Sequence, residues 1–110
     1  MAVTTKVLIA AKIAENAQTT QYTATGVTVI IDKFTARNYG AAAASLSANL
    51  VTSGGAAGDS NLVVNKTLQP GETYTFPEIV GHVLIAGGFI STIASAATTI
   101  AIRASGREIS

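Results

Sequence analysis

The sequence predicts an all-β, antiparallel sandwich built from short strands. Runs rich in β-branched and aromatic residues are separated by turn residues about every 8 to 12 positions, which is typical of a two-sheet sandwich. Within these runs, apolar and polar residues alternate with a period of two, as they do in a strand with one buried face. Near the middle of the chain, Pro70 and Gly71 fit the central positions of a type II turn, and Pro77 ends the alternating strand at residues 72–76.

The first 26 residues differ from the rest of the chain. Residues 3–13 carry apolar side chains on both faces, and residues 15–26 are polar, with Tyr22 as the only large side chain. We therefore expect residues 1–26 to form an edge strand, or an extended arm that packs on a neighbour, because a two-faced apolar strand needs cover on both sides. Residues 27–110 form the β-sandwich domain. The predicted interaction residues are Val7, Leu8, Ile9, Ile13 and Tyr22.

Residues 27–50 predict a hairpin of two strands. The run at residues 27–38 is rich in β-branched and aromatic side chains, and a turn signal follows at residues 38–40. In the next run, apolar residues alternate with Ser and Asn from Ala44 to Leu50. The alanines at positions 41–44 would suit a helix, but no apolar residues recur at helical spacing after them.

The second half of the chain predicts four more strands and one helical segment. Residues 52–60 read as a loop, and strands are expected at residues 61–66, 72–76, 89–95 and 98–104. Residues 77–84 combine an early proline, an acidic residue and apolar residues at helical spacing, which predicts one or two helical turns.

The composition indicates one domain with a thin core. The chain has 110 residues, of which 48% are hydrophobic, but many of these are alanine, and three Phe, three Tyr and no Trp supply the large side chains. A small-residue core in a domain of this size gives modest stability. We therefore expect the chain to form a homo-oligomer or to dock on another protein.

The charge pattern does not predict a nucleic-acid or membrane partner. Charged residues make up 12% of the chain and the net charge is +1, whereas a typical soluble domain has about 25% charged residues. The seven Lys and Arg residues are scattered along the sequence without a run, and no aromatic residues are interleaved with them. No apolar run approaches the roughly 20 residues of a membrane-spanning helix.

No constellation of residues in the sequence predicts an enzyme, a cofactor or a metal site. The chain has no cysteine, and His82 is its only histidine. Asp32 and Glu78 are not brought together by any motif. The glycines of residues 53–59 lack the Gly-Lys-Ser/Thr ending of a phosphate-binding loop, so these residues are predicted to form a loop tip.

Several segments resemble a group of small virion proteins of tailed phages and prophages. The resemblance is carried by residues 18–24, 30–36, 53–55, 68–74 and 88–91, and it extends over most of the chain from about residue 17. It implies a small immunoglobulin-like β-sandwich. The implied role is a subunit added to the phage particle, on the capsid surface or near the neck or tail. Of these we expect a capsid decoration, or cement, subunit that is assembled in the host cytoplasm and binds the major capsid protein on the outside of the head.

Two other roles remain open at this stage. A neck, tail or fibre-attachment component of the virion would use the same kind of sandwich. A carbohydrate- or ligand-binding sandwich ranks last, because it would need aromatic residues clustered in loops, and Tyr39 is the one obvious loop aromatic. The resemblance supplies no catalytic residues to transfer.

Overall fold

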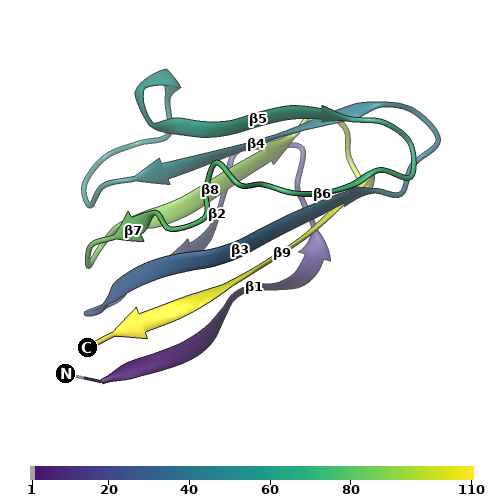
Figure 1. The fold of residues 1–110 in the computed structure, drawn as a ribbon. Helices are drawn as coiled ribbons and strands as arrows, with labels where there is room; N and C mark the ends of the chain where they lie inside the picture. The colour runs from purple at the N-terminus through teal and green to yellow at the C-terminus, as the bar shows by residue number, and fades with distance from the viewer. Residues whose placement is uncertain (1) are drawn as a thin grey trace.

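The computed structural model describes residues 2–110 as two antiparallel sheets packed face to face (Figure 1). One sheet has five strands and the other has four. The strands are β1 (Val3–Ile13), β2 (Thr19–Thr23), β3 (Thr28–Asn38), β4 (Ala44–Val51), β5 (Leu62–Leu68), β6 (Thr73–Thr75), β7 (Val83–Leu84), β8 (Phe89–Ala94) and β9 (Ile100–Ile109), with a 3-10 turn, η1, at Asp59–Asn61. Within residues 2–110, no helix is long and apolar enough to span a membrane.

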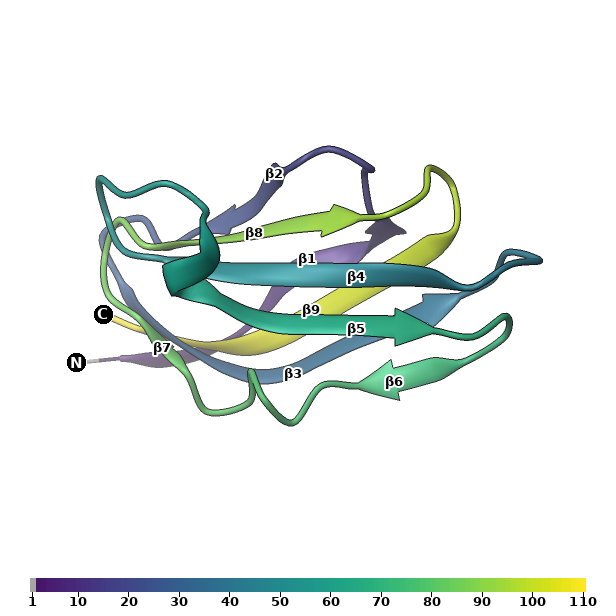
Figure 2. The same ribbon diagram turned by 90° about the horizontal axis from the view of Figure 1, so that it is seen from above.

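The strand pairing is nested around the β4–β5 hairpin. β4 pairs with β5, β3 with β6 and β7, β2 with β8, and β1 with β9, always antiparallel. This long double ribbon is rolled up so that β3 also pairs with β9, and β4 with β8. The sheets therefore have the orders β1-β9-β3-β6 and β2-β8-β4-β5 (Figure 2), which is the strand order of a jelly roll.

The predicted antiparallel sandwich is confirmed, and its strand order corrects the immunoglobulin-like part of the expectation. In an immunoglobulin domain the first strand pairs with the second strand of its own sheet. Here β1 pairs with β9, the last strand, along its whole length. The chain ends are joined as well, since the backbone N–H groups of Ala2 and Ser110 each donate to the other residue's carbonyl at 3.0 Å.

The core lies between the two sheets and follows the predicted alternation. Phe34 and Phe76 meet edge to face, with ring centroids 5.7 Å apart, and both are fully buried. On β4 the alternating residues from Ala44 to Ala48 face inward as expected. Leu50 continues this alternation, because it lies opposite the buried Ile90 of β8 and packs against the core, as the sequence predicted.

Residues 77–82 form turns between β6 and β7, and the predicted helix is wrong. β6 and β7 pair with two different stretches of β3, and the chain between them leaves the sheet and returns. The Phe76 N–H donates to the Phe34 carbonyl at 2.9 Å, and the Gly81 N–H donates to the Ile31 carbonyl at 2.7 Å. Pairing with β3 therefore overrides the local helical pattern. The helical turn among residues 2–110 is η1, in the loop between β4 and β5.

The N-terminal segment supplies edge strands to both sheets. β1 is the edge of the five-stranded sheet, and β2 is the edge of the four-stranded sheet. Of the two alternatives for residues 1–26, the edge strand is the one observed for residues 2–26, and Met1 lies outside the described residues. Register shifts after Val7 and after Ile9 mark bulges in β1.

Candidate interaction surface

The outer side of the five-stranded sheet brings together the exposed apolar and cationic side chains of three strands. We call it the β1–β9–β3 face. Its members are the residues that point away from the four-stranded sheet, as their strand pairing and burial indicate. They are Val3, Thr5, Val7, Ala11 and Ile13 on β1, Ala101, Arg103, Ser105, Arg107 and Ile109 on β9, and Thr28, Ile30, Asp32, Lys33, Thr35 and Arg37 on β3.

Four of the seven cations of the chain lie on this face. Lys33 and Arg37 alternate with buried residues on β3, and Arg103 and Arg107 do the same on β9. The two strands are neighbours, with Lys33 opposite Ser105 and Thr35 opposite Arg103. The four cations, which are scattered in the sequence, therefore lie on adjacent strands of one sheet.

Arg107 is the one cation of this group with a carboxylate partner. Its guanidinium donates two hydrogen bonds to the Asp32 carboxylate, with Nη2 at 2.9 Å from Oδ1 and Nε at 3.0 Å from Oδ2. The hydrogen bonds to Asp32, followed by its negative charge, raise the pKa of the Arg107 guanidinium. Among residues 2–110, no carboxylate lies within 4.0 Å of the charged groups of Lys33, Arg37 or Arg103.

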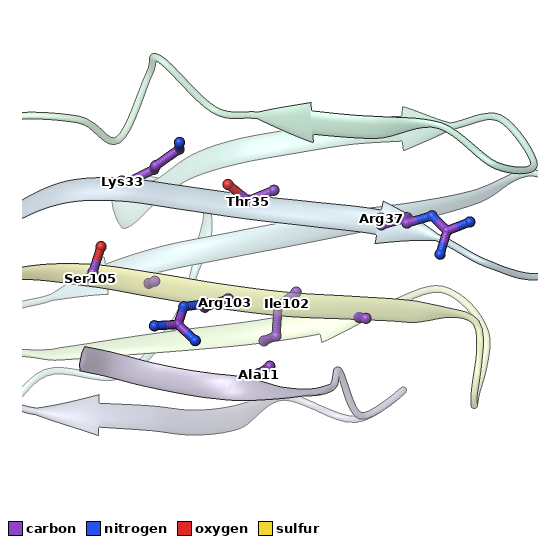
Figure 3. A pocket seen from close by; sticks show the side chains of 9 residues that line it. Ala11, Lys33, Thr35, Arg37, Ile102, Arg103 and Ser105 are labelled. Atoms are coloured by element: carbon purple, nitrogen blue, oxygen red, sulfur yellow. The ribbon is translucent and has the colours of Figure 1, made fainter.

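A groove runs along β9 beside these three unpaired cations (Figure 3). Its volume is about 350 Å³. Small residues form its floor, and Lys33 and Arg37 rise from β3 while Arg103 rises from β9. The lining residues are Ala11, Lys33, Thr35, Arg37, Ala101, Ile102, Arg103, Ala104 and Ser105.

Apolar side chains flank the groove on β1 and at the far end of the sheet. Val7 and Ile13 are 46% and 45% exposed on β1, and Val3 is 56% exposed. On the opposite edge, Val83 of β7 is 50% exposed and lies across from Ile30. Exposed apolar side chains on the same face as the cations are ones that a partner protein would cover.

Two of the five predicted interaction residues, Val7 and Ile13, lie on this face. Leu8 and Ile9 do not, because they are 5% and 2% exposed and belong to the core. The bulge after Val7 turns both of these neighbouring side chains inward, which corrects their predicted role. The sequence had suggested that both faces of this strand are covered, whereas Leu8 and Ile9 are the only buried residues of β1.

Tyr22, the fifth predicted residue, makes an internal contact. Its hydroxyl donates to Glu108 Oε2 at 2.7 Å, which links β2 to β9. Burial, and then the Glu108 carboxylate, raise the pKa of the Tyr22 phenol above its usual value of 10.0. Tyr22 also packs against the core, so its ring and its hydroxyl are both used within the fold.

The outer side of the four-stranded sheet is different, because its amides and hydroxyls bond to one another. The Gln18 amide donates to Ser91 Oγ at 2.7 Å. The Asn49 amide donates to the Gly58 carbonyl at 2.9 Å and to Asn61 Oδ1 at 2.7 Å, which ties the glycine-rich loop to β4. These glycines thus belong to a structural loop.

The other titratable side chains singled out in the sequence, Asp32 and His82, do not form a cluster with one another. Asp32 is engaged by Arg107, and His82 lies exposed in the turn before β7. Among residues 2–110, no group of three His, Cys, Asp or Glu side chains is placed to hold a metal ion. No protein-family model, curated protein or solved structure matches the chain.

Sequence reasoning missed Lys33, Arg37 and Arg103. The signal was present within each strand, since Lys33, Thr35 and Arg37 alternate, as do Arg103, Ser105 and Arg107. What the sequence does not show is that the two strands pair with each other.

Proposed function

We propose that this chain is a structural subunit of a bacteriophage virion. In this proposal it is a capsid decoration subunit that binds the major capsid protein on the outside of the head and stabilises the shell. The observation that carries the proposal is the β1–β9–β3 face, where exposed Val7 and Ile13 lie beside three unpaired cations. The sequence resemblance to small phage virion proteins supports the choice of partner.

The partner meets the face of the sheet, and not its open edge. β1 is 11 residues long and its outer edge is unpaired within the described chain, so strand addition by a neighbour is the obvious alternative. However, two bulges interrupt the edge, and Lys6 and Lys12 lie along it. Bulges and edge lysines are the features with which sheet proteins discourage edge pairing.

The architecture suits this role. Jelly rolls occur in viral capsid domains, although a fold by itself does not assign a function. With the β1–β9–β3 face on the shell, the internally bonded amides and hydroxyls of the other sheet face the solvent. That arrangement places the adhesive surface and the neutral surface on opposite sides of one small domain.

The test is to purify virions of the phage that encodes the chain and to measure its copy number against the major capsid protein. Decoration predicts a copy number in proportion to the capsid protein, with density on the head surface in electron microscopy. A single ring of copies would place the chain at the neck or tail instead. Virions that lack the protein would contradict the proposal.

Point substitutions are better suited to this test than deletion of the N-terminal strand. Deleting β1 would also remove Leu8 and Ile9 from the core, so lost binding would not be distinguishable from lost folding. Exposed residues of the face avoid this problem.

A further inference from the structure

We propose that the groove on the β1–β9–β3 face binds an extended, acidic segment of a partner protein. The identity of that partner as a shell protein rests on the proposed function, but the preference of the groove for carboxylates is independent of it. The inference starts from Lys33, Arg37 and Arg103, the cations around the groove that have no carboxylate partner within residues 2–110.

The spacing of these cations matches an extended chain. Lys33 and Arg37 are four residues apart on β3, which corresponds to about 13 Å at the rise of a strand. Arg103 faces Thr35 on the neighbouring strand, so it lies between them along the sheet. A segment in extended conformation has the same rise, and its alternate side chains point the same way. Acidic residues at alternate positions of such a segment meet the three cations in turn.

The floor of the groove gives such a segment room. Ala11 and Ala101 present methyl groups where larger side chains would fill the space, and Ser105 adds a hydroxyl. The volume of about 350 Å³ suits a few residues of one chain. Val7 and Ile13 then lie at the β1 side, where apolar residues of the same partner can cover them.

The chemistry favours carboxylates. Arg37 and Arg103 have planar guanidinium groups that bind a carboxylate through two parallel hydrogen bonds, as Arg107 binds Asp32 on the same face. The Arg107–Asp32 pair shows that an arginine on this sheet can present both donors to one carboxylate.

A peptide fits the groove better than a nucleic acid does. Proteins that bind single strands without sequence preference combine cations with aromatic side chains on which bases stack. None of the nine lining residues is aromatic. The cations are also confined to about 13 Å of one sheet, and the net charge of the chain is +1.

The first experiment measures binding of a labelled peptide of alternating Glu and Thr to the full chain by fluorescence anisotropy. A Gln-Thr peptide of the same length and an oligothymidine of the same charge serve as comparison probes. We expect the Glu-Thr peptide to bind best, and to bind more weakly when ionic strength rises from about 0.01 M to about 0.15 M.

Two variants and one control locate the binding. Arg37→Glu with Arg103→Glu reverses the cations, and we expect binding to weaken about tenfold. Ala101→Leu fills the groove without changing charge and should also weaken binding. Lys66→Glu with Ser47→Asp and Thr67→Asp changes the net charge equally but lies on β4 and β5 of the other sheet, and it should leave binding within about twofold. Thermal unfolding confirms that each variant is folded.

Several results would overturn the inference. These are equal binding of the Glu-Thr and Gln-Thr peptides, an equal loss in the control, or tighter binding of oligothymidine. Self-association at low salt that disappears in the groove variant would make a second copy of the chain the occupant, and would overturn it too.

A second assay separates the inference from the proposed function. Wild-type chain and the Arg37→Glu, Arg103→Glu variant are mixed with phage particles that lack the protein. We expect the wild type to bind and the variant to bind about tenfold more weakly. Equal binding would overturn the groove assignment and leave the proposed function standing. If the wild type binds no particle, the proposed function fails, and the peptide result still decides the groove.

Discussion

The outer sides of the two sheets differ in the polar groups that the fold leaves without an internal partner. On the four-stranded sheet, Gln18 and Asn49 bond to neighbouring side chains and to the glycine-rich loop. On the five-stranded sheet, Arg37 and Arg103 have no such partner among residues 2–110. Both sheets alternate buried and outward-facing residues, so alternation alone does not distinguish them. The comparison shows that the two outer faces are distinguished by which polar groups have partners within the fold.

The largest expected effect concerns the apolar part of the β1–β9–β3 face. Val7→Asp with Ile13→Asp places charges where the partner should cover apolar side chains, so we expect particle binding to weaken about a hundredfold. Ser47→Asp with Thr67→Asp adds the same charge to the other sheet and should bind normally. Cosedimentation with particles measures both. Equal losses in the two variants would break the distinction between the faces.

The next prediction concerns ionic strength. Because the cations of the β1–β9–β3 face are exposed, raising the salt concentration from about 0.05 M to about 0.5 M should weaken particle binding roughly tenfold by screening. The Arg37→Glu, Arg103→Glu variant should lose most of this salt dependence. Binding that is insensitive to salt would mean that the cations do not contact the partner.

Asn49 tests the opposite face, where we expect an effect on stability instead of binding. Asn49→Ala removes the donor to the Gly58 carbonyl and to Asn61, and it should lower the free energy of unfolding by about 1 to 2 kcal/mol. Asn65→Ala removes an exposed residue of β5 and should change it by less than about 0.5 kcal/mol. Urea unfolding measures both variants. Weaker particle binding by folded Asn49→Ala would contradict the assignment.

The smallest effect concerns Tyr22, which joins the two sheets. Its pKa is raised in the folded state, so the unfolded chain loses this proton first as pH rises above 10.0. The folded state then binds more protons than the unfolded state, and stability falls with increasing pH. Tyr22→Phe should flatten this fall in thermal unfolding measured between pH 9 and about pH 11. An unchanged pH profile would show that the Tyr22–Glu108 bond does not control it.

Local patterns predicted the strands well where residues alternate clearly. The expected strand at residues 27–38 corresponds to β3, and the alternation from Ala44 corresponds to β4. The prediction failed at residues 77–82, because Pro77 and the apolar spacing resemble the start of a helix. There the backbone instead bonds to Phe34 and Ile31, which are distant in sequence and invisible to a local pattern.

The candidate site was predicted less well than the strands. Val7 and Ile13 are exposed, as their predicted interaction role requires, but Leu8 and Ile9 were not recognised as core residues because bulges leave little trace in the sequence. A bulge depends on the register with the partner strand, and the partner of β1 is β9, at the other end of the chain.

Where no bulge interrupts a strand, the sequence by itself determined which side chains point outward, because alternation is a property of the extended backbone. It therefore fixed that Lys33 and Arg37 share one side of β3, and that Arg103 and Arg107 share one side of β9. Only the tertiary structure decided that these two sides are the same surface. Strand pairing between residues so distant in sequence arises from packing of the whole sandwich, and it turns scattered charges into one face.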